Sequence, residues 1–315
     1  MKREKNQHGT TSRPMLRRSW YIVVLATALL AAGCQKEIAT TSGNGGDVAA
    51  SKAPPKAPVL VVHAGNSIQA AINSAGAGSV IKIEAGLYKE SLTVNKPITL
   101  MGEDGVILQN PGEEDYGIVV QDGADGFALK NITIRGFKQR ALFMTYVDGF
   151  LLSHVTVISN GEFGLFAEYC KNGLIEHCEG TGHTETSVFV GQSTNVTISQ
   201  NKSYANVIGY EVENSSYVTL DKNHAYDNSV GIMCLLVPGR ITKESSNITI
   251  TKNQVRENNR PNFSAPPEME SVLPAGVGIL MLGINNSLVQ DNLVTENQFT
   301  GVAVVSTLVM ALLAN

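Results

Sequence analysis

The stretch "VTISQNKSYANVIGYEV" (residues 196–212) places a short apolar-polar alternation on either side of a segment that contains two asparagines. Residues 218–234, "VTLDKNHAYDNSVGIMC", follow the same pattern. Shorter copies occupy residues 248–258, "ITITKNQVREN", and 288–297, "LVQDNLVTEN". In every copy the second Asn comes five positions after the first. The chain is therefore built from internal repeats.

The first Asn of each repeat sets the period. Its positions, continued upstream by the equivalent residues, are Ile132, Val155, Cys178, Asn201, Asn223, Asn253 and Asn292. The differences between successive residue numbers are 23, 23, 23, 22, 30 and 39. A period of about 22 residues indicates a solenoid, and period-two alternation between turn residues predicts short strands. We predict an all-β fold, a right-handed parallel β-helix solenoid whose inward Asn side chains stack from coil to coil.

A short helix is predicted before the first strands of the solenoid. Asn66 and Ser67 are suitable N-cap residues. The apolar residues that follow have helical spacing, and they are Ile68, Ala71, Ile72 and Ala75. Because the open end of a solenoid must be covered, we expect this helix to cap the N-terminal end.

Residues 1–58 have the composition of a targeting segment and a tether. Three arginines, Arg13, Arg17 and Arg18, precede the apolar run 20–32, which predicts a signal peptide over residues 1–33. The string "LLAAGC" resembles the bacterial lipobox, which implies lipidation of Cys34; the alternative is an ordinary signal peptide with an incidental cysteine. Residues 34–58 are polar and rich in Gly, Ser, Pro and Lys, so we expect a disordered tether. The β-helix domain then covers residues 59–315.

Charge and cysteine content exclude some classes of function. Residues 34–315 carry 18 basic and 27 acidic side chains, a net charge of −9. Such a chain lacks the basic surface that nucleic acid requires, so we expect no nucleic-acid partner. Beyond residue 34 the cysteines are Cys170, Cys178 and Cys234, whose spacing predicts neither a disulfide framework nor a metal site.

Further strings carry a family resemblance. From Asn66 onward the chain resembles pectin-lyase-like right-handed β-helix proteins. More narrowly, it is similar to uncharacterised bacterial parallel β-helix domain lipoproteins in the strings "VFVGQS" (188–193), "YEVENS" (210–215), "LLVPG" (235–239), "NNRPNF" (258–263) and "LPAGVG" (273–278). This resemblance implies a lipid-anchored protein of the bacterial cell envelope, and Gln35 after the lipobox cysteine favours the outer membrane, with the domain facing the periplasm or the exterior.

The strand alternation predicts which side chains point away from the core. The outward pairs, coil by coil, are Phe143/Thr145, Phe166/Glu168, Phe189/Gly191, Glu211/Glu213, Met233/Leu235 and Leu280/Leu282. The three phenylalanines form an apolar stripe, which we interpret as a ligand-binding platform. We expect Glu211 and Glu213 to be solvated rather than catalytic.

Two insertions account for the longer repeats. They cover residues 236–246, after the outward strand, and residues 259–275, before it. Because loops on a rigid scaffold are common sites of function, we predict that both wall a groove on one sheet face. Its floor would include Phe189, Glu211, Glu213 and Met233.

The sequence leaves two functions open. The first is binding of a polysaccharide or surface ligand in this groove. The second, implied by the resemblance, is a polysaccharide lyase or epimerase acting on uronate-containing glycans, with Glu211, Glu213, Glu185 and His183 as candidate catalytic residues and Arg240 or Lys243 neutralising the substrate carboxylate. No cofactor is predicted for the first function, whereas Ca²⁺ would fit the second. The Asp-Pro-His-Asp string expected of mannuronan epimerases is absent, and His183 also occupies an Asn position of the repeat, where a structural role is the alternative.

The last residues, "VAVVSTLVMALLAN" (302–315), end without a polar cap. Because solenoids normally end in one, we expect the C-terminus to be truncated relative to relatives of the chain or to end in a shifted reading frame.

Overall fold

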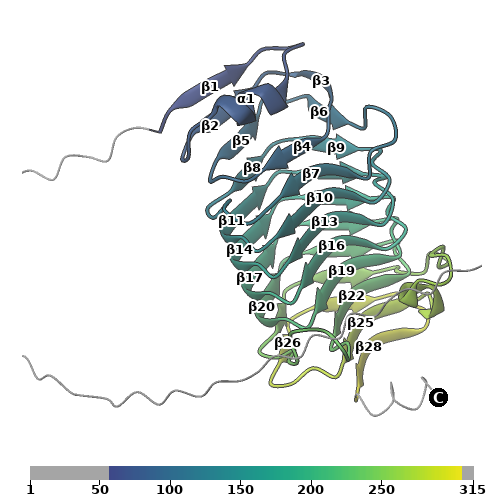
Figure 1. The fold of residues 1–315 in the computed structure, drawn as a ribbon. Helices are drawn as coiled ribbons and strands as arrows, with labels where there is room; N and C mark the ends of the chain where they lie inside the picture. The colour runs from purple at the N-terminus through teal and green to yellow at the C-terminus, as the bar shows by residue number, and fades with distance from the viewer. Residues whose placement is uncertain (1–56, 307–315) are drawn as a thin grey trace, which may run out of the picture. The chain divides into compact units, whose positions relative to one another are not determined.

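The computed structural model describes residues 57–306, and they form a stack of parallel β-strand coils (Figure 1). Each coil contributes a strand to each of three parallel sheets, so strands distant in sequence lie side by side. Sheet 1 has ten strands: β1 (Val59–Val62), β2 (Val80–Ile83), β5 (Thr99–Gly102), β8 (Ala128–Lys130), β11 (Asp148–Ser153), β14 (Lys171–Glu176), β17 (Thr194–Ser199), β20 (Ser216–Asp221), β23 (Thr249–Thr251) and β26 (Leu288–Gln290).

The other two sheets have nine strands each. Sheet 2 consists of β3 (Gly86–Lys89), β6 (Val106–Gln109), β9 (Thr133–Arg135), β12 (Thr156–Ile158), β15 (Glu179–Thr181), β18 (Lys202–Tyr204), β21 (His224–Tyr226), β24 (Gln254–Arg256) and β27 (Leu293–Thr295). Sheet 3 consists of β4 (Leu92–Val94), β7 (Tyr116–Val120), β10 (Arg140–Thr145), β13 (Phe163–Glu168), β16 (Thr186–Gly191), β19 (Ile208–Glu213), β22 (Val230–Leu235), β25 (Val277–Leu282) and β28 (Thr300–Val305). The predicted all-β parallel solenoid is confirmed.

The register between coils follows the repeat. In sheet 3, Phe143 of β10 pairs with Phe166 of β13, Phe166 pairs with Phe189 of β16, and Phe189 pairs with Glu211 of β19. The residues that alternate with the predicted outward positions are buried in one continuous core: Leu142, Met144, Leu165, Ala167, Val188, Val190, Tyr210, Val212, Ile232, Cys234, Ile279 and Met281. The predicted inward and outward faces of the strands are therefore confirmed.

Two ladders of asparagines hold the corners of the coils. The Nδ2 atom of Asn201 donates to Asn223 Oδ1 at 2.9 Å, and Asn223 donates in the same way to Asn253 at 3.0 Å. The residue before each ladder position has a left-handed backbone, for example Gln200 with φ 58° and Lys222 with φ 54°. This single left-handed residue turns the chain, and the inward Asn then satisfies backbone groups that the turn leaves unpaired. The asparagine hydrogen bonds continue between the coils on either side of each insertion. The insertions therefore leave the register between coils unchanged.

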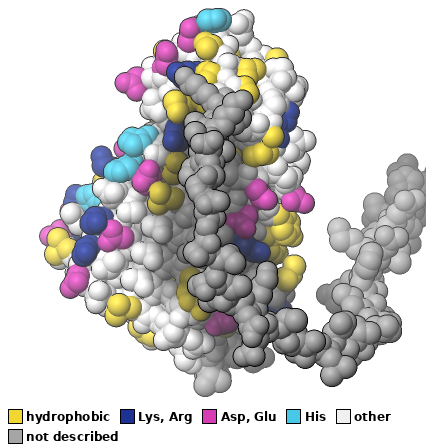
Figure 2. Space-filling model, turned by 90° about the vertical axis from the view of Figure 1, so that its left-hand side faces the viewer, with side chains coloured by type: hydrophobic (Ala, Val, Ile, Leu, Met, Phe, Trp, Pro, Cys, Tyr) yellow, Lys and Arg dark blue, Asp and Glu magenta, His cyan; other side chains and the backbone are white. Residues whose placement is uncertain are grey.

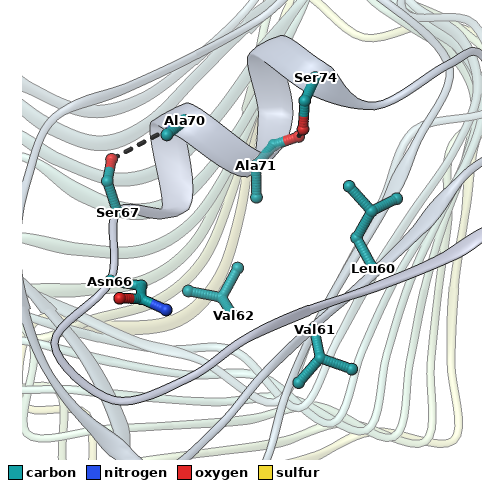
Figure 3. A pocket seen from close by; sticks show the side chains of 8 residues that line it. All are labelled: Leu60, Val61, Val62, Asn66, Ser67, Ala70, Ala71 and Ser74. Carbon is teal, nitrogen blue, oxygen red and sulfur yellow. Dashed lines mark hydrogen bonds between the residues drawn. The ribbon is translucent and has the colours of Figure 1, made fainter.

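Helix α1 (Ile68–Ser74) lies at the N-terminal end of the described chain, and a shallow hollow separates it from β1 (Figure 3). The Oγ atom of Ser67 accepts a hydrogen bond from the Ala70 N–H at 3.1 Å, which is the predicted N-cap. Ile68 and Ile72 are buried in the solenoid core. The helix thus forms where the sequence predicts it.

Several predictions concern residues outside the described range. The signal peptide over residues 1–33, the lipidated Cys34, all but the last two residues of the tether and residues 307–315 all fall there. Within residues 57–306, no helix is long and apolar enough to cross a membrane.

Candidate functional site

The outer face of sheet 3 is covered at its C-terminal half by both insertions. Residues 236–246 follow β22 and residues 259–275 precede β25, and both fold back over the outward side chains of this sheet. The prediction that the two insertions lie on one face is confirmed. They pack down onto the predicted floor, however, instead of standing as the walls of an open groove.

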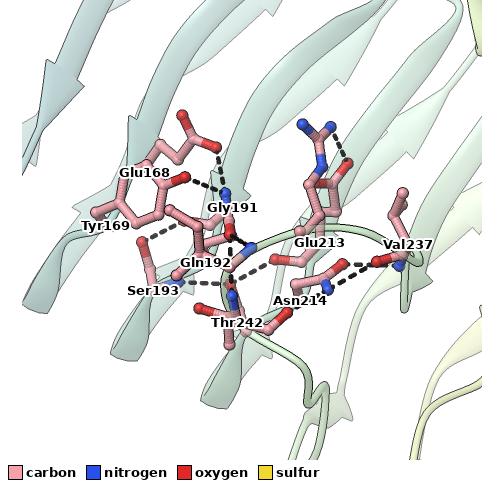
Figure 4. A network of polar contacts seen from close by, with 12 residues as sticks. Glu168, Tyr169, Gly191, Gln192, Ser193, Glu213, Asn214, Val237 and Thr242 are labelled. Atoms are coloured by element: carbon pink, nitrogen blue, oxygen red, sulfur yellow. Dashed lines mark hydrogen bonds and ion pairs between the residues drawn. The ribbon is translucent and has the colours of Figure 1, made fainter. Parts of the chain in front are cut away.

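The first insertion is fixed by polar contacts to the strand ends below it (Figure 4). The Asn214 side chain donates to the carbonyls of Val237 at 3.0 Å and Thr242 at 2.7 Å. The Gln192 side-chain oxygen accepts from the Thr242 N–H at 3.1 Å. Arg240 forms an ion pair with Glu213, with 2.6 Å between Nε and Oε1. This insertion is therefore docked through backbone groups and one buried carboxylate.

The second insertion carries a short 3₁₀ helix, η1 (Met269–Val272). Asn262 donates to the carbonyls of Glu270 and Leu273, at 2.8 and 2.9 Å, and so closes the loop on itself. Leu273 packs on an apolar cluster at the C-terminal part of sheet 3, which includes Met233. Carboxylate oxygens of Glu268 and Glu270 lie within 4.8 Å of an oxygen of Glu185, in the turn before β16.

The covering insertions change the environment of the predicted glutamates. Only 1% of Glu211, 2% of Glu213 and 5% of Glu185 is exposed. The expectation that Glu211 and Glu213 are solvated is therefore wrong, because outward strand positions become buried wherever a loop covers the sheet. Thr186 Oγ1 donates to Glu211 Oε2 at 2.5 Å, which gives Glu211 one polar partner.

Burial and mutual repulsion shift the pKa values of these carboxyl groups. Desolvation, followed by the charge of Glu270, raises the pKa of Glu185 to about 8. The same two causes, in the same order, raise the pKa of Glu211 well above its ordinary value of 4.5. For Glu213, desolvation raises the pKa and Arg240 opposes the shift. The three carboxyl groups therefore bind protons more tightly than exposed glutamates do, and the pKa of Glu185 lies above neutral pH.

The predicted phenylalanine platform is mostly covered. Phe166 and Phe189 are 6% and 4% exposed, and their rings stack with centroids 4.4 Å apart. The guanidinium of Arg140 lies 4.4 Å from the Phe166 ring centroid and 4.9 Å from that of Phe143, a cation–π arrangement. Of the three stripe residues, only Phe143 is partly exposed. An open platform formed by all three rings is therefore a wrong prediction.

A different aromatic pair, with one ring exposed and the other half-buried, lies beside the first insertion, and the prediction from sequence missed it. Tyr146 and Tyr169 stack with centroids 4.8 Å apart and an interplanar angle of 5°. Tyr146 is 56% exposed, and the Tyr169 hydroxyl accepts a 2.7 Å hydrogen bond from the Gln192 side chain, which in turn holds Thr242. Both tyrosines follow the end of a sheet 3 strand and occupy equivalent positions in consecutive repeats, so the repeat alignment contained this signal.

His183 takes an Asn position in the second ladder. Its N–H donates to Asn206 Oδ1 at 3.0 Å, and its Nδ1 accepts from the Asn160 N–H at 3.4 Å. The ring is fully buried, and desolvation lowers its pKa to about 4. These contacts agree with the structural alternative for His183, because the ring lies inside the coil and away from the covered face.

The other residues named from the sequence lie either in the first insertion or in the core. Arg240 is 44% exposed at its side chain and contacts the face through Glu213, whereas Lys243 donates to the Arg240 carbonyl within the same loop. Cys170, Cys178 and Cys234 are free thiols buried in the core. On the face shown in Figure 2, basic and acidic side chains are interspersed.

An apolar cavity of about 380 Å³ lies at the C-terminal end of the same face. Its lining comes from the last three strands of sheet 3 and from η1, and it includes Met233, Leu235, Leu273, Leu280 and Glu270. Glu270 thus touches both the carboxylate cluster and the cavity.

Solved structures that share this architecture include two epimerase modules. The A-modules of the mannuronan C-5 epimerases AlgE6 and AlgE4 of Azotobacter vinelandii match with TM-scores of 0.54 and 0.53, at 16% and 18% identity. Each match covers 71% of this chain and 71% of that module. At this identity the likeness shows the fold alone. No curated protein sequence is significantly similar to this chain.

A family model described as "Right handed beta helix region" matches residues 104–239 and 140–309, which together make up more than half of the chain. The matched segments span the Asn ladders, both insertions and most of sheet 3. The handedness and parallel stacking predicted from the repeat agree with this match, and the chain belongs to the right-handed β-helix family.

Proposed function

We propose that the protein binds a polysaccharide on the outer face of sheet 3, beside the first insertion. The stack of the exposed Tyr146 on the half-buried Tyr169 is the observation that carries this proposal. Sugar rings present C–H faces that pack on aromatic rings, and their hydroxyls require polar partners next to those rings. Glu168 and Arg240 supply such partners beside the rings, whereas Gln192 is buried and holds Tyr169 and the first insertion in place.

The likeness to mannuronan epimerases supports an acidic polysaccharide as the ligand class. Mannuronan is the substrate that the names of those two proteins state. The partly exposed Arg240 offers a positive charge beside the tyrosine pair, although its ion pair with Glu213 neutralises part of this charge. Phe143, which stacks on Tyr116 with centroids 5.3 Å apart, extends the aromatic surface along the neighbouring coils.

Affinity electrophoresis tests the proposal. The full chain is run through gels that contain alginate, pectate or a neutral glucan, and we expect retardation in the acidic gels. Changing both Tyr146 and Tyr169 to Ala is expected to weaken the affinity about thirtyfold, since each ring contributes about 1 kcal/mol. Tyr217→Ala is the matched control, because Tyr217 is 63% exposed and lies in β20 of sheet 1. Absence of retardation in every gel would refute polysaccharide binding.

A polysaccharide lyase or epimerase is the second candidate function. Its support is the pair Glu185 and Glu211, whose raised pKa values are typical of acid–base groups. Turnover would appear as absorbance of an unsaturated uronate or as proton exchange at C5. Loss of that turnover in Glu211→Gln, with gel retardation unchanged, would assign the chemistry to Glu211. Retardation without turnover would leave binding alone.

We also propose that the protein is attached to the bacterial cell envelope through a lipid on Cys34. The support is the lipobox-like string before that cysteine and the polar tether after it. Such an anchor would hold the β-helix domain close to a polysaccharide of the envelope or its surroundings.

A further inference from the structure

Three carboxylates from distant parts of the sequence meet at the edge of the covered face. Glu185 lies in the turn before β16, whereas Glu268 and Glu270 belong to the second insertion. One oxygen from each lies within 4.8 Å of the other two. Three negative charges at this spacing repel one another strongly unless a positive charge or protons compensate them.

Glu185 has no hydrogen-bond or ion-pair partner among the described residues, and the charge of Arg140 lowers its pKa by less than burial and the neighbouring glutamates raise it. It is 5% exposed and its carboxylate has no hydrogen-bond donor and no ion pair within residues 57–306, yet it points at the two insertion glutamates. The arginines around this face contact other groups: Arg140 lies over the phenylalanines with Glu162 3.9 Å away, and Arg240 pairs with Glu213. A buried carboxylate without a partner is costly and requires an explanation.

The two insertion glutamates are also free to bind a ligand. Glu268 is the N-cap residue of η1, but its side chain makes no capping hydrogen bond. Glu270 follows two positions later and its carboxylate faces Glu185. Glu268 is exposed, so the cluster has an opening to solvent through which an ion can enter.

We propose that Glu185, Glu268 and Glu270 bind one divalent cation of the Ca²⁺ class, which fastens the second insertion to sheet 3. Carboxylate oxygens are the ligands of hard cations, and nothing in the cluster offers the nitrogen or sulfur that Zn²⁺ prefers. Ca²⁺ binds oxygens at about 2.3–2.6 Å, so three oxygens spaced evenly around one ion can lie up to about 4.5 Å from one another, close to the upper limit of 4.8 Å in this cluster. Mg²⁺, at about 2.0–2.1 Å, requires three such oxygens to lie within about 3.6 Å of one another and fits less well.

The ion would fix the position of the second insertion, which covers the outer face of sheet 3. This role does not depend on polysaccharide binding at Tyr146 and Tyr169. Residues of η1 and Leu273 form one wall of the apolar cavity, and the same insertion supplies Glu270, whose charge acts on Glu211. Fixing this loop through Glu185 therefore sets both the shape of the cavity and the burial of Glu211.

Calorimetric titration of the chelator-treated full chain with CaCl₂ and MgCl₂ tests the proposal, together with thermal unfolding in each salt. We expect one Ca²⁺ per chain, a higher unfolding temperature in Ca²⁺ and weaker binding of Mg²⁺. Replacing Glu268 and Glu270 by Gln together should weaken Ca²⁺ binding by about tenfold or more. Glu296→Gln, which removes an exposed carboxylate elsewhere, should bind Ca²⁺ as the unchanged protein does.

The unfolding temperature in chelator separates lost binding from lost folding. The double variant removes repulsion, so in chelator it should unfold at the same or a higher temperature than the unchanged protein. Absence of Ca²⁺ binding in the unchanged protein would overturn the proposal and would mean that protons alone compensate the cluster. Equal Ca²⁺ binding by the double variant and the Glu296→Gln control would also overturn it.

Discussion

Arg240 Nε lies 2.6 Å from Oε1 of Glu213, a carboxylate that is 2% exposed and belongs to an earlier coil. The pair joins the first insertion to a strand of sheet 3. Removing a partner from a buried charge is more costly than removing a surface ion pair, because the remaining charge stays desolvated.

Arg240→Ala is therefore expected to destabilise the protein at neutral pH. Because Arg240 itself is 44% exposed at its side chain, we expect a loss of about 1–2 kcal/mol, less than for a fully buried pair. Urea unfolding measures this loss. Adding Glu213→Gln should restore most of the stability, since the uncompensated charge is then gone; a double variant as unstable as Arg240→Ala would contradict this explanation.

Stability should also depend on pH through Glu185. Its folded-state pKa of about 8 lies above the ordinary value of 4.5, so the folded protein binds a proton more tightly than the unfolded chain does. The stabilisation is fully present below about pH 4.5 and is lost as the pH rises through about 8. We expect the unfolding free energy, measured in chelator, to fall by about 2 kcal/mol over this range, because water at the open side of the cluster screens part of the effect.

Glu185→Gln should flatten this pH dependence, because glutamine does not titrate. Glu296→Gln is the control and should retain the slope. A slope that is equally steep in Glu185→Gln would assign it to another group, with Glu211 next to be tested.

The repeat allowed most of the fold to be predicted. The positions of Asn201 and Asn223 gave the coil register, and the alternation around Phe189 and Glu211 gave the correct side of the sheet. Both signals are local, because a period and a two-residue alternation are properties of short segments.

The burial of the outward side chains of sheet 3 was not predictable from such local signals. The strand alternation predicts that Glu211 points outward, and it does. An insertion from two coils further along the chain nevertheless buries it, and no local sequence pattern determines where that insertion folds. The cluster of Glu185 with Glu268 and Glu270 has the same origin, because it requires an insertion to return to an earlier coil. The Tyr146–Tyr169 stack, in contrast, follows from the repeat alignment, since equivalent corner positions lie side by side in neighbouring coils.

Cys34→Ser tests the proposed lipid anchor. We expect the unchanged chain, expressed in a bacterium with a lipoprotein pathway, to sediment with the membranes and to incorporate labelled fatty acid. The variant should lose the label and move to the soluble periplasmic fraction. The serine at Ser42 allows a control, since Ser42→Ala alters the tether and leaves Cys34 in place. Equal labelling of Cys34→Ser and Ser42→Ala would show that Cys34 is not the lipidation site.

Replacing an asparagine at the centre of the ladder should lower the stability strongly, whereas replacing one at its end should lower it only weakly. The Asn228 side chain accepts from the Asn206 N–H and Nδ2, at 3.1 and 3.0 Å, and donates to Asn258 Oδ1 at 2.9 Å and to the Ser203 carbonyl at 3.1 Å. Asn228→Ala leaves several buried groups without partners, and we expect a loss of about 2–4 kcal/mol in unfolding free energy.

Asn297 is the matched control for Asn228. It occupies the last described position of the same ladder and is half-buried, so water can replace its hydrogen bonds when it is changed to Ala. We expect a loss below about 1 kcal/mol for Asn297→Ala. If both variants lose the same stability, the ladder stabilises each coil independently of burial. A much larger loss at Asn228 would show that the cost comes from stranding buried donors and acceptors.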